Sequence, residues 1–259
     1  MNQFPLVLLR TLLPVLFFIF STPLGAQVCR VLVMSPSDKF PAADICTQLR
    51  SMLQTSGEFS DVEVTYRDIT SDVYLATSLL GVAYVPPYRD GHLAAIQQGS
   101  WTHVVLIDRP FCYAVAPELH YQGVNAVAKI ISAAGAQPVL MMPWVDRTTI
   151  DGVATNNALV REYAYRIGDG VRDSLGRSVP VVPAGAAWSS LAAGARGAVP
   201  AQPTLGVALN TNAKYCAAAS LFHYLTGQNP KSGGFVPAGL SAATRDAIAD
   251  HAVAAAASE

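Results

Sequence analysis

The sequence has 259 residues, of which 14% are charged, and its formal net charge is −1. That balance excludes the strongly basic surface expected of a protein that binds nucleic acid or an anionic membrane. The hydrophobic share of 51% is enough for a real core, which favours a globular protein over a disordered one.

Residues 1–26 have the layout of a secretory signal peptide. One early charge, Arg10, precedes an apolar run over 12–20, and small and polar residues then lead to Ala26. The apolar run is too short to span a bilayer in the mature chain. We therefore expect cleavage after Ala26 and a secreted or periplasmic protein with no stable membrane span. Residues 27–259 then suit a single domain.

Apolar runs and alternating patterns predict five strands, at 29–34, 61–66, 101–107, 139–142 and 179–182. Capping residues and a helical period predict helices at 41–57, 117–135, 156–175, 212–226 and 241–257. Residues 67–100 and 189–208 show no regular pattern, and the first stretch is long enough to be a binding loop. Strands that alternate with helices predict an α/β fold whose parallel sheet is covered on both faces.

Four cysteines follow the leader: Cys29, Cys46, Cys112 and Cys216. Disulfides persist in exported proteins, so one or two bridges could form, and the sequence does not choose the pairing. There is no C-x-x-C pair and no Cys/His cluster at zinc spacing. The sequence therefore indicates neither a metal nor a cofactor, and it leaves the oligomeric state open.

The stretch 30–40 joins an apolar strand to a helical pattern through a short polar turn that contains Ser37. In open α/β sheets the carboxyl end of a strand meets a helix N-terminus at such a turn, and backbone N–H groups point at a ligand there. Ser37 is therefore a candidate nucleophile. The alternative is a turn hydroxyl that satisfies local N–H groups.

Five segments, taken in order, carry a likeness to a known family: 31–40, 99–106, 117–144, 183–188 and 214–227. The second reads G-S-W-T-H-V-V-L, the fourth reads P-A-G-A-A-W, and the fifth opens with K-Y-C-A-A-A. Together they resemble the SGNH (GDSL-like) hydrolases, in particular a secreted bacterial branch. The resemblance covers nearly all of the mature chain. It implies a three-layer α/β/α sandwich with a five-stranded parallel sheet, of the SGNH-hydrolase or flavodoxin-like type.

The resemblance also implies a chemistry. The family hydrolyses acyl esters with a serine nucleophile, a histidine base and an aspartate that orients the histidine. The Asp and His come as D-x-x-H just before the last helices. By this resemblance Ser37 falls at the nucleophile position and Gly81 at the glycine that helps to hold the oxyanion. The substrate would be a small-molecule or glycan ester.

The catalytic motifs depart from the family pattern in three places. The G-[DN]-S motif reads S-P-S at 35–37, and Pro36 removes one backbone donor. The amide-bearing residue after the third strand is replaced by Asp108-Arg109. The D-x-x-H is missing, since residues 206–213 contain neither Asp nor His.

A base for Ser37 would have to come from one of five histidines: His92, His103, His120, His223 and His251. Only His92 lies in the long irregular stretch, from which it could swing to the site. The sequence thus matches the family in the order of its segments but has no recognisable histidine base.

Several other residues follow the predicted strands and are candidates to line a pocket. Asp108 and Arg109 form either an ion pair or cap at the strand end, or the polar floor of the crevice. Trp144 and Trp188 are either core or lid aromatics, or a stacking surface for a sugar ring. Asn210 is either a helix cap or a residue of the pocket lining.

Two functions stay open. One is an exported ester hydrolase, acting on a carbohydrate or acyl ester, with Ser37 as nucleophile. The other is a catalytically inactive relative that binds a glycan or an acylated ligand in the same crevice. The missing D-x-x-H favours the inactive binding protein as the mechanism. The likeness along the chain favours the ester hydrolases as the class of protein.

Overall fold

A computed structural model describes residues 27–36, 42–69, 86–145, 149–150, 153–154, 156–194 and 211–258. Three of the candidate site residues, Ser37, Gly81 and Asn210, lie outside this part of the chain, as do the leader 1–26 and the residues around the expected D-x-x-H.

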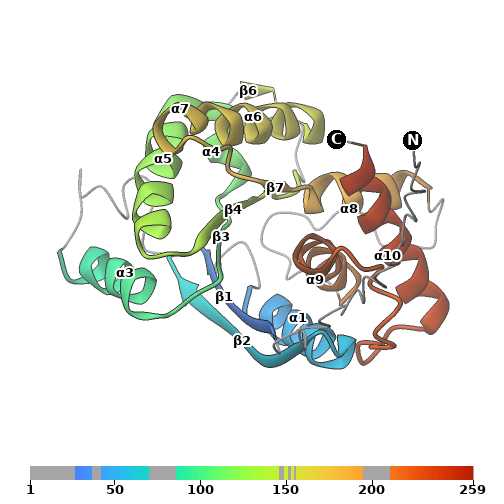
Figure 1. The fold of residues 1–259 in the computed structure, drawn as a ribbon. Helices are drawn as coiled ribbons and strands as arrows, with labels where there is room; N and C mark the ends of the chain where they lie inside the picture. The colour runs from blue at the N-terminus through green and yellow to red at the C-terminus, as the bar shows by residue number, and fades with distance from the viewer. Residues whose placement is uncertain are drawn as a thin grey trace, which may run out of the picture.

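Five parallel strands form the central sheet, in the order β2-β1-β3-β4-β7 (Figure 1). They are β1 (Gln27–Ser35), β2 (Phe59–Asp68), β3 (His103–Leu106), β4 (Gln137–Met141) and β7 (Val181–Val182). A separate antiparallel pair, β5 (Thr149–Ile150) with β6 (Val153–Ala154), was not expected. The predicted strand number, their parallel direction and the edge position of β2 are confirmed.

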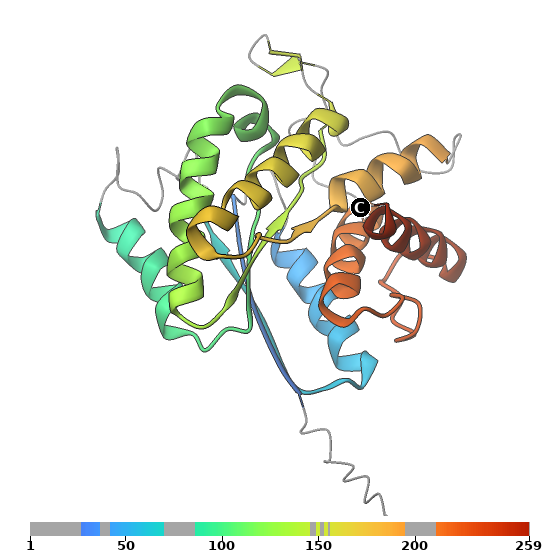
Figure 2. The same ribbon diagram turned by 45° about the horizontal axis from the view of Figure 1, so that its top comes forward.

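Helices cover both faces of the sheet and complete the predicted three layers (Figures 1 and 2). One layer holds α3 (Pro86–Gln98), α4 (Pro110–Val115), α5 (Pro117–Ala133), α6 (Asn157–Gly170) and α7 (Arg172–Leu175). The other holds α1 (Ala42–Ser56), α8 (Ala184–Gly194), α9 (Thr211–Thr226) and α10 (Ala242–Ala257). No helix of the described residues is both long and apolar enough to cross a membrane.

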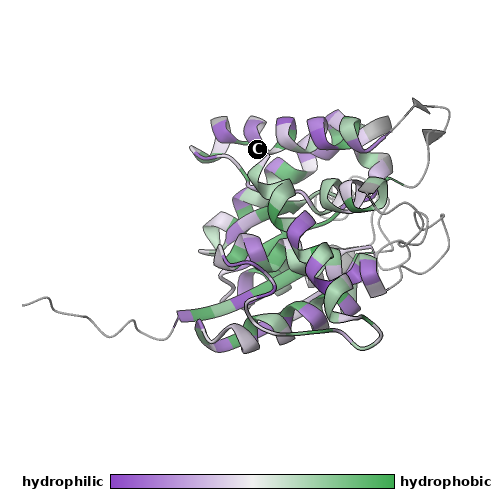
Figure 3. Ribbon diagram, turned by 90° about the vertical axis from the view of Figure 1, so that its right-hand side faces the viewer, coloured by the Kyte–Doolittle hydropathy of each residue, from purple (hydrophilic) through white to green (hydrophobic). Residues whose placement is uncertain are grey.

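The side chains of β1 point alternately to the two faces of the sheet, and the core accordingly has two parts, one on each face. Val31 and Val33 pack against the layer that contains α1 and α9, whereas Leu32 and Met34 pack against the layer that contains α5. All four side chains are at most 1% exposed. A strand buried on both faces needs an unbroken apolar run, and this explains why the sequence around residue 31 does not alternate in polarity. In Figure 3 the hydrophobic residues are concentrated in the central strands, whereas the surrounding helices carry both hydrophobic and hydrophilic residues.

The predicted cap at Ser241 is confirmed, and Asn156, the predicted start of a helix, is found to cap it. The Asn156 side chain accepts a hydrogen bond from the backbone N–H of Leu159 at 2.9 Å, and Ser241 accepts one from that of Thr244 at 3.1 Å. Asn212 is not a cap, because α9 already begins at Thr211.

Other predicted boundaries were wrong in informative ways. The stretch 67–100 is not irregular throughout, because β2 continues to Asp68 and α3 spans Pro86–Gln98. The stretch 189–208 begins inside α8, which ends at Gly194. Both errors involve helices with weak amphipathic patterns, so the helical period gave little signal.

No disulfide joins the four cysteines, all of which lie in the described part of the chain and are buried. Burial raises the pKa of Cys29 to about 11, and burial also raises the pKa of Cys46 and of Cys216 to about 12. A thiol that resists ionisation in this way is a poor nucleophile. The cysteines therefore act as small core residues here, and the expectation of disulfides is not supported.

Gly185 fixes the position of α8 at the end of the sheet. Its N–H donates to the carbonyl of Met142 at 3.1 Å, just after β4 ends. A Cβ built on Gly185 would lie 2.2 Å from the carbonyl oxygen of Pro143. Only glycine permits so close an approach of a helix to backbone, which accounts for the central glycine of the 183–188 segment.

We expect Gly185→Ala to lower the free energy of unfolding by about 2 kcal/mol, because the methyl group must push α8 away from the backbone at Pro143. Urea unfolding followed by circular dichroism would measure the change. Ala193→Ser, exposed on the same helix, is the control and should change stability by less than about 0.5 kcal/mol. Equal stability of the Gly185→Ala variant and the wild type would contradict this account.

Candidate functional site

The carboxyl edge of the sheet is where the fold places ligands, and its central part is formed by the ends of β1 and β3. Met34 pairs with Leu106 in the parallel register. Two residues further along each chain segment, Asp108 therefore lies beside Pro36. Ser35 is fully buried. Its carbonyl accepts hydrogen bonds from the Tyr66 hydroxyl at 3.0 Å and from the backbone N–H of Ile69, just after β2. Ser35 is therefore a structural residue, as expected.

Asp108 lies at the end of β3 and is only 3% exposed. Its Oδ1 accepts a hydrogen bond from the backbone N–H of Arg109 at 2.8 Å, and Oδ2 lies 3.5 Å from Nε2 of His120. Arg109 is the N-cap of α4, but no side chain caps that helix. Asp108 is thus neither a helix cap nor one half of a surface ion pair. It is a buried carboxyl group at the floor of the carboxyl edge.

His120, on the first turns of α5, is the partner that the sequence did not reveal. Its side chain has no exposure, and its Nδ1 has no hydrogen-bond partner among the described residues. The ring packs edge-on against Tyr113, with 4.3 Å between ring centroids and 75° between the planes. The link between Asp108 and His120 forms because short α4 turns the chain back, so that α5 begins beside the end of β3. Sequence spacing alone gives no sign of that turn.

Burial dominates the electrostatics of this cluster. It lowers the pKa of His120, and the nearby Asp108 acts in the opposite direction. Burial raises the pKa of Tyr113 well above its usual value, and the charge of Asp108 adds to that effect. The pKa of Cys112 is raised in the same way, first by burial and then by the charge of Asp108 and its hydrogen bond. At neutral pH the histidine, tyrosine and cysteine around Asp108 are therefore uncharged.

The two tryptophans after β4 and β7 belong to the core. Trp188 is 1% exposed and Trp144 is 8% exposed. Both pack in the core layer formed with α1, α8, α9 and α10. Neither has a ring face open to a ligand, so their burial favours the core alternative over a stacking surface for sugar.

The other four histidines are held by contacts away from this cluster. Nδ1 of His92 accepts a hydrogen bond from Arg67 Nε at 3.2 Å, so His92 could act as a base through Nδ1 only if that bond broke. His103 lies at the opposite end of β3, with Nδ1 3.0 Å from the Thr102 hydroxyl. His223 donates from Nδ1 to the carbonyl of Gln228 at 2.8 Å, and His251 Nδ1 lies 3.0 Å from the Ser190 hydroxyl.

A metal site finds no support in the described residues, in which no group of three or more His, Cys, Asp and Glu side chains could hold an ion. A cavity in the described part of the chain lies elsewhere, beside the edge strand β7. Sequence reasoning missed its lining residues, although a strand of two valines between Pro180 and Pro183 is the pattern of an edge strand.

Comparison with known proteins finds the fold but no close relative. No family model matches the sequence, and no curated protein matches it. Among solved structures, a DUF4886 family protein from Bacteroides uniformis superposes with a TM-score of 0.66 at 15% identity, covering 89% of this chain and 95% of that one. A candidate SGNH hydrolase from Slackia heliotrinireducens gives a TM-score of 0.54 at 21% identity, covering 77% and 100%. An acetyl xylan esterase gives 0.51 at 13% identity, covering 76% and 99%.

The chain has the SGNH-hydrolase fold. The likeness extends over most of the chain, in agreement with the order of segments that first suggested it. The buried group of Asp108, His120 and Tyr113 lies at the carboxyl end of β3, beside the carboxyl end of β1.

We expect the free energy of unfolding to fall as the pH drops through about 6.5, the ordinary pKa of histidine. The unfolded chain takes up a proton there that buried His120 resists, so the unfolded state gains protons first and stability decreases toward acid pH. Partial burial also lowers the pKa of half-buried His103, which contributes with the same sign. His120→Gln should flatten this pH dependence by up to about 1.4 kcal/mol per pH unit.

Urea unfolding at a series of pH values between 5 and 8 would measure both slopes, as that is the range in which histidine titrates. Gln122→Asn, at an exposed position of the same helix, is the control and should keep the wild-type slope. A His120→Gln variant with an unchanged slope would show that His120 is not the group resisting protonation.

Proposed function

We propose that this protein is an exported binding protein with the SGNH-hydrolase fold, which holds a glycan or an acylated ligand at the carboxyl edge of its sheet without cleaving it. The observation that carries this proposal is the state of the histidines. All five lie in the described part of the chain. His120 is fully buried, and Nδ1 of His92 is occupied by the hydrogen bond from Arg67. His103 lies at the other end of β3, and His223 and His251 lie on α9 and α10, where they contact Gln228 and Ser190. A serine without a base is a poor nucleophile at neutral pH.

Two further observations support a ligand at this edge. Asp108 and Arg109 follow a central strand, at the position where open α/β sheets bind their ligands. One structural neighbour is named as an acetyl xylan esterase, which makes an acetylated sugar a reasonable first ligand to test. The site has the frame of an ester-binding crevice and no described group that would activate Ser37.

A second candidate is an ester hydrolase that uses His120 as its base. The observation that favours it is the 3.5 Å contact between His120 Nε2 and Asp108 Oδ2, the one histidine–carboxylate pair among the described residues. An aspartate next to an imidazole is the orienting half of a Ser-His-Asp arrangement. For this mechanism the other ring nitrogen, Nδ1, would have to reach the Ser37 hydroxyl, and His120 would have to become accessible.

A fluorophosphonate probe and a series of p-nitrophenyl esters separate the two candidates. For a binding protein we expect no labelling at Ser37, and ester turnover that is the same in the wild type and in Ser37→Ala. For the hydrolase, labelling would disappear in Ser37→Ala and His120→Gln, and turnover would fall by about a thousandfold or more. Ser35→Ala is the matched control, because Ser35 is the buried neighbour in the same motif.

Mass spectrometry of the labelled peptide would identify the reactive serine. This matters because Ser190 and His251 form a hydrogen-bonded pair at 3.0 Å on α8 and α10. Label on Ser190 would contradict both candidates.

The binding function itself predicts that acetylated xylo-oligosaccharide, at about 100 times its Kd, adds about 2.7 kcal/mol of stability. If neither this ligand nor a fatty-acyl ester raised the Tm, the proposal of a binding protein would fail.

Export is the remaining part of the proposal. The apolar leader supports it, and β1 begins at Gln27, so cleavage after Ala26 would leave the first strand whole. Expression of the full chain in a bacterium with an export system should give a protein outside the cytoplasm whose amino-terminal residue is Gln27. Amino-terminal sequencing of the purified protein would check this. An intact leader on protein found in the cytoplasm would contradict it.

A further inference from the structure

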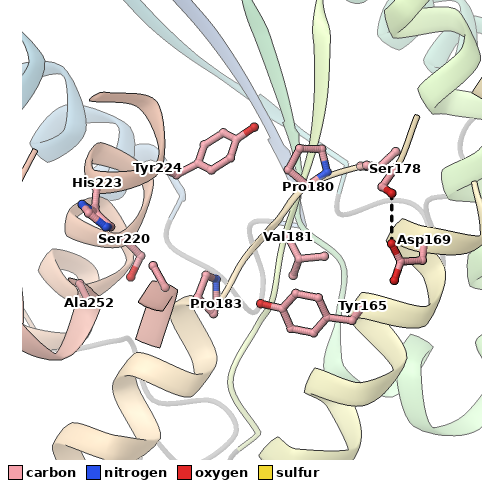
Figure 4. Close-up of a pocket in the computed structure, with 12 residues that line it drawn as sticks. Tyr165, Asp169, Ser178, Pro180, Val181, Pro183, Ser220, His223, Tyr224 and Ala252 are labelled. Atoms are coloured by element: carbon pink, nitrogen blue, oxygen red, sulfur yellow. Dashed lines mark hydrogen bonds between the residues drawn. The ribbon is translucent and has the colours of Figure 1, made fainter. Parts of the chain in front are cut away.

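A cavity of about 420 Å³ lies along the open edge of the sheet, beside β7. Figure 4 shows its three sides: β7 forms the floor, α6 one wall, and α9 with α10 the other. Its volume falls within the range of ligand pockets in proteins. The lining includes none of Asp108, Arg109 and His120, so the cavity is separate from the site at the carboxyl edge.

The floor includes one backbone N–H and one backbone C=O, both of Val181, that no neighbouring strand of the described chain pairs with. Leu140 N–H donates to the carbonyl of Pro180 at 2.8 Å, and Met142 N–H donates to that of Val182 at 2.9 Å. These carbonyls point toward β4. Successive strand residues direct their backbone groups to opposite sides, so Val181 turns both its N–H and its C=O away from β4. Because β7 is the last strand of the sheet, both groups face the cavity.

The open edge is limited to a single residue, because Val179 N–H already donates to the carbonyl of Gly168 at 2.9 Å and Pro183 has no N–H. Pro180 and Pro183 flank the two valines, line the cavity and have no N–H to donate. Proline at an edge normally prevents a long strand from adding to a sheet. Here it leaves one donor and one acceptor, on the same residue, at the centre of the floor. The site therefore matches one residue of a ligand rather than a whole strand.

The walls carry polar groups directed toward this floor. Tyr165 from α6 and Tyr224 from α9 project from opposite sides toward β7 (Figure 4). The Tyr165 hydroxyl is buried and has no hydrogen-bond partner in the described part of the chain. Because His223 donates from Nδ1 to a carbonyl, its neutral ring leaves Nε2 as an acceptor. Ser220 donates to the carbonyl of Cys216 at 2.9 Å and keeps its lone pairs.

Charge further restricts the ligand. Among the lining residues Asp169 is the one carboxylate, and there is no lysine or arginine. The Asp169 carboxylate is itself paired with Arg172 at 3.4 Å. No lining side chain offers a positive charge to an anionic group such as a carboxyl terminus, so a segment without negative charge suits the cavity.

We propose that this cavity binds one residue of a neutral or basic, extended peptide, which exchanges hydrogen bonds with the N–H and C=O of Val181. In an extended peptide the N–H and C=O of one residue point to the same side, as those of Val181 do, so the two match. A single amide, such as that of an N-acetylated sugar, points its N–H and C=O in opposite directions and satisfies only one of them. Tyr165 and Tyr224 then flank the bound residue, and strand addition supplies the affinity.

The test uses the mature protein labelled with ¹⁵N and a capped peptide of three alanines as probe, titrated to about 20 mM because a contact of one residue binds weakly. We expect a saturable shift of the Val181 amide resonance. N-methylation at one position of the probe should weaken binding at least about tenfold, whereas methylation at the neighbouring positions should not, because alternate N–H groups point away from the strand.

Two variants of α10 locate the site. Ala256→Trp fills the cavity from its wall and should abolish the shift, whereas Ala257→Trp, at the exposed neighbouring position, should bind as the wild type does. Circular dichroism would confirm that both are folded. Tyr165→Phe should weaken binding, and Tyr163→Phe, on the same helix but outside the lining, should not.

Three results would overturn the proposal: no saturable shift with the probe, equal binding to the wild type and Ala256→Trp, or equal binding of all N-methylated probes. A shift of the Val181 amide with N-acetylglucosamine or xylose but not with the tripeptide would make the cavity a sugar site and would also overturn it.

Discussion

The burial of a carboxyl group at the end of β3 is the constraint on which the rest of the carboxyl edge depends. A carboxyl group without partners in a protein interior costs several kcal/mol, so Asp108 requires polar neighbours. The N–H of Arg109, the next residue in the chain, reaches one oxygen, and the bend between α4 and α5 brings the His120 ring to the other. Tyr113 then closes the cluster by packing on His120. The helices on this side of the sheet are arranged around one buried acid.

The packing of this fold is independent of the side chains that catalysis in a hydrolase would need. The sheet order, the layers and the approach of α8 at Gly185 are features of the whole fold and do not depend on any catalytic group. The imidazoles, by contrast, are used as structural groups: one is buried beside Asp108 and another accepts a hydrogen bond from Arg67. A place for a ligand at the strand ends follows from topology alone, whatever the catalytic groups of the chain are.

The sequence predicted those features that depend on periodicity and on local chemistry. The apolar run of β1, the buried face of α1 and the caps at Asn156 and Ser241 all follow from patterns within a few residues. The sequence could not predict the contact of Asp108 with His120, which depends on the direction in which a six-residue helix turns the chain. Nor could it decide whether Trp144 and Trp188 face the core or a ligand, since an aromatic after a strand suits both. The roles of Ser37, Gly81 and Asn210 stay predictions.

The short edge strand β7 also has a consequence for the protein at high concentration. A long open edge would invite the same edge of another molecule to pair with it, and parallel sheets with such edges tend to aggregate. With proline on both sides of two valines, the sheet ends after five strands and cannot be extended by a long partner. The prolines thus limit the width of the sheet and protect the protein from pairing edge to edge with its own copies.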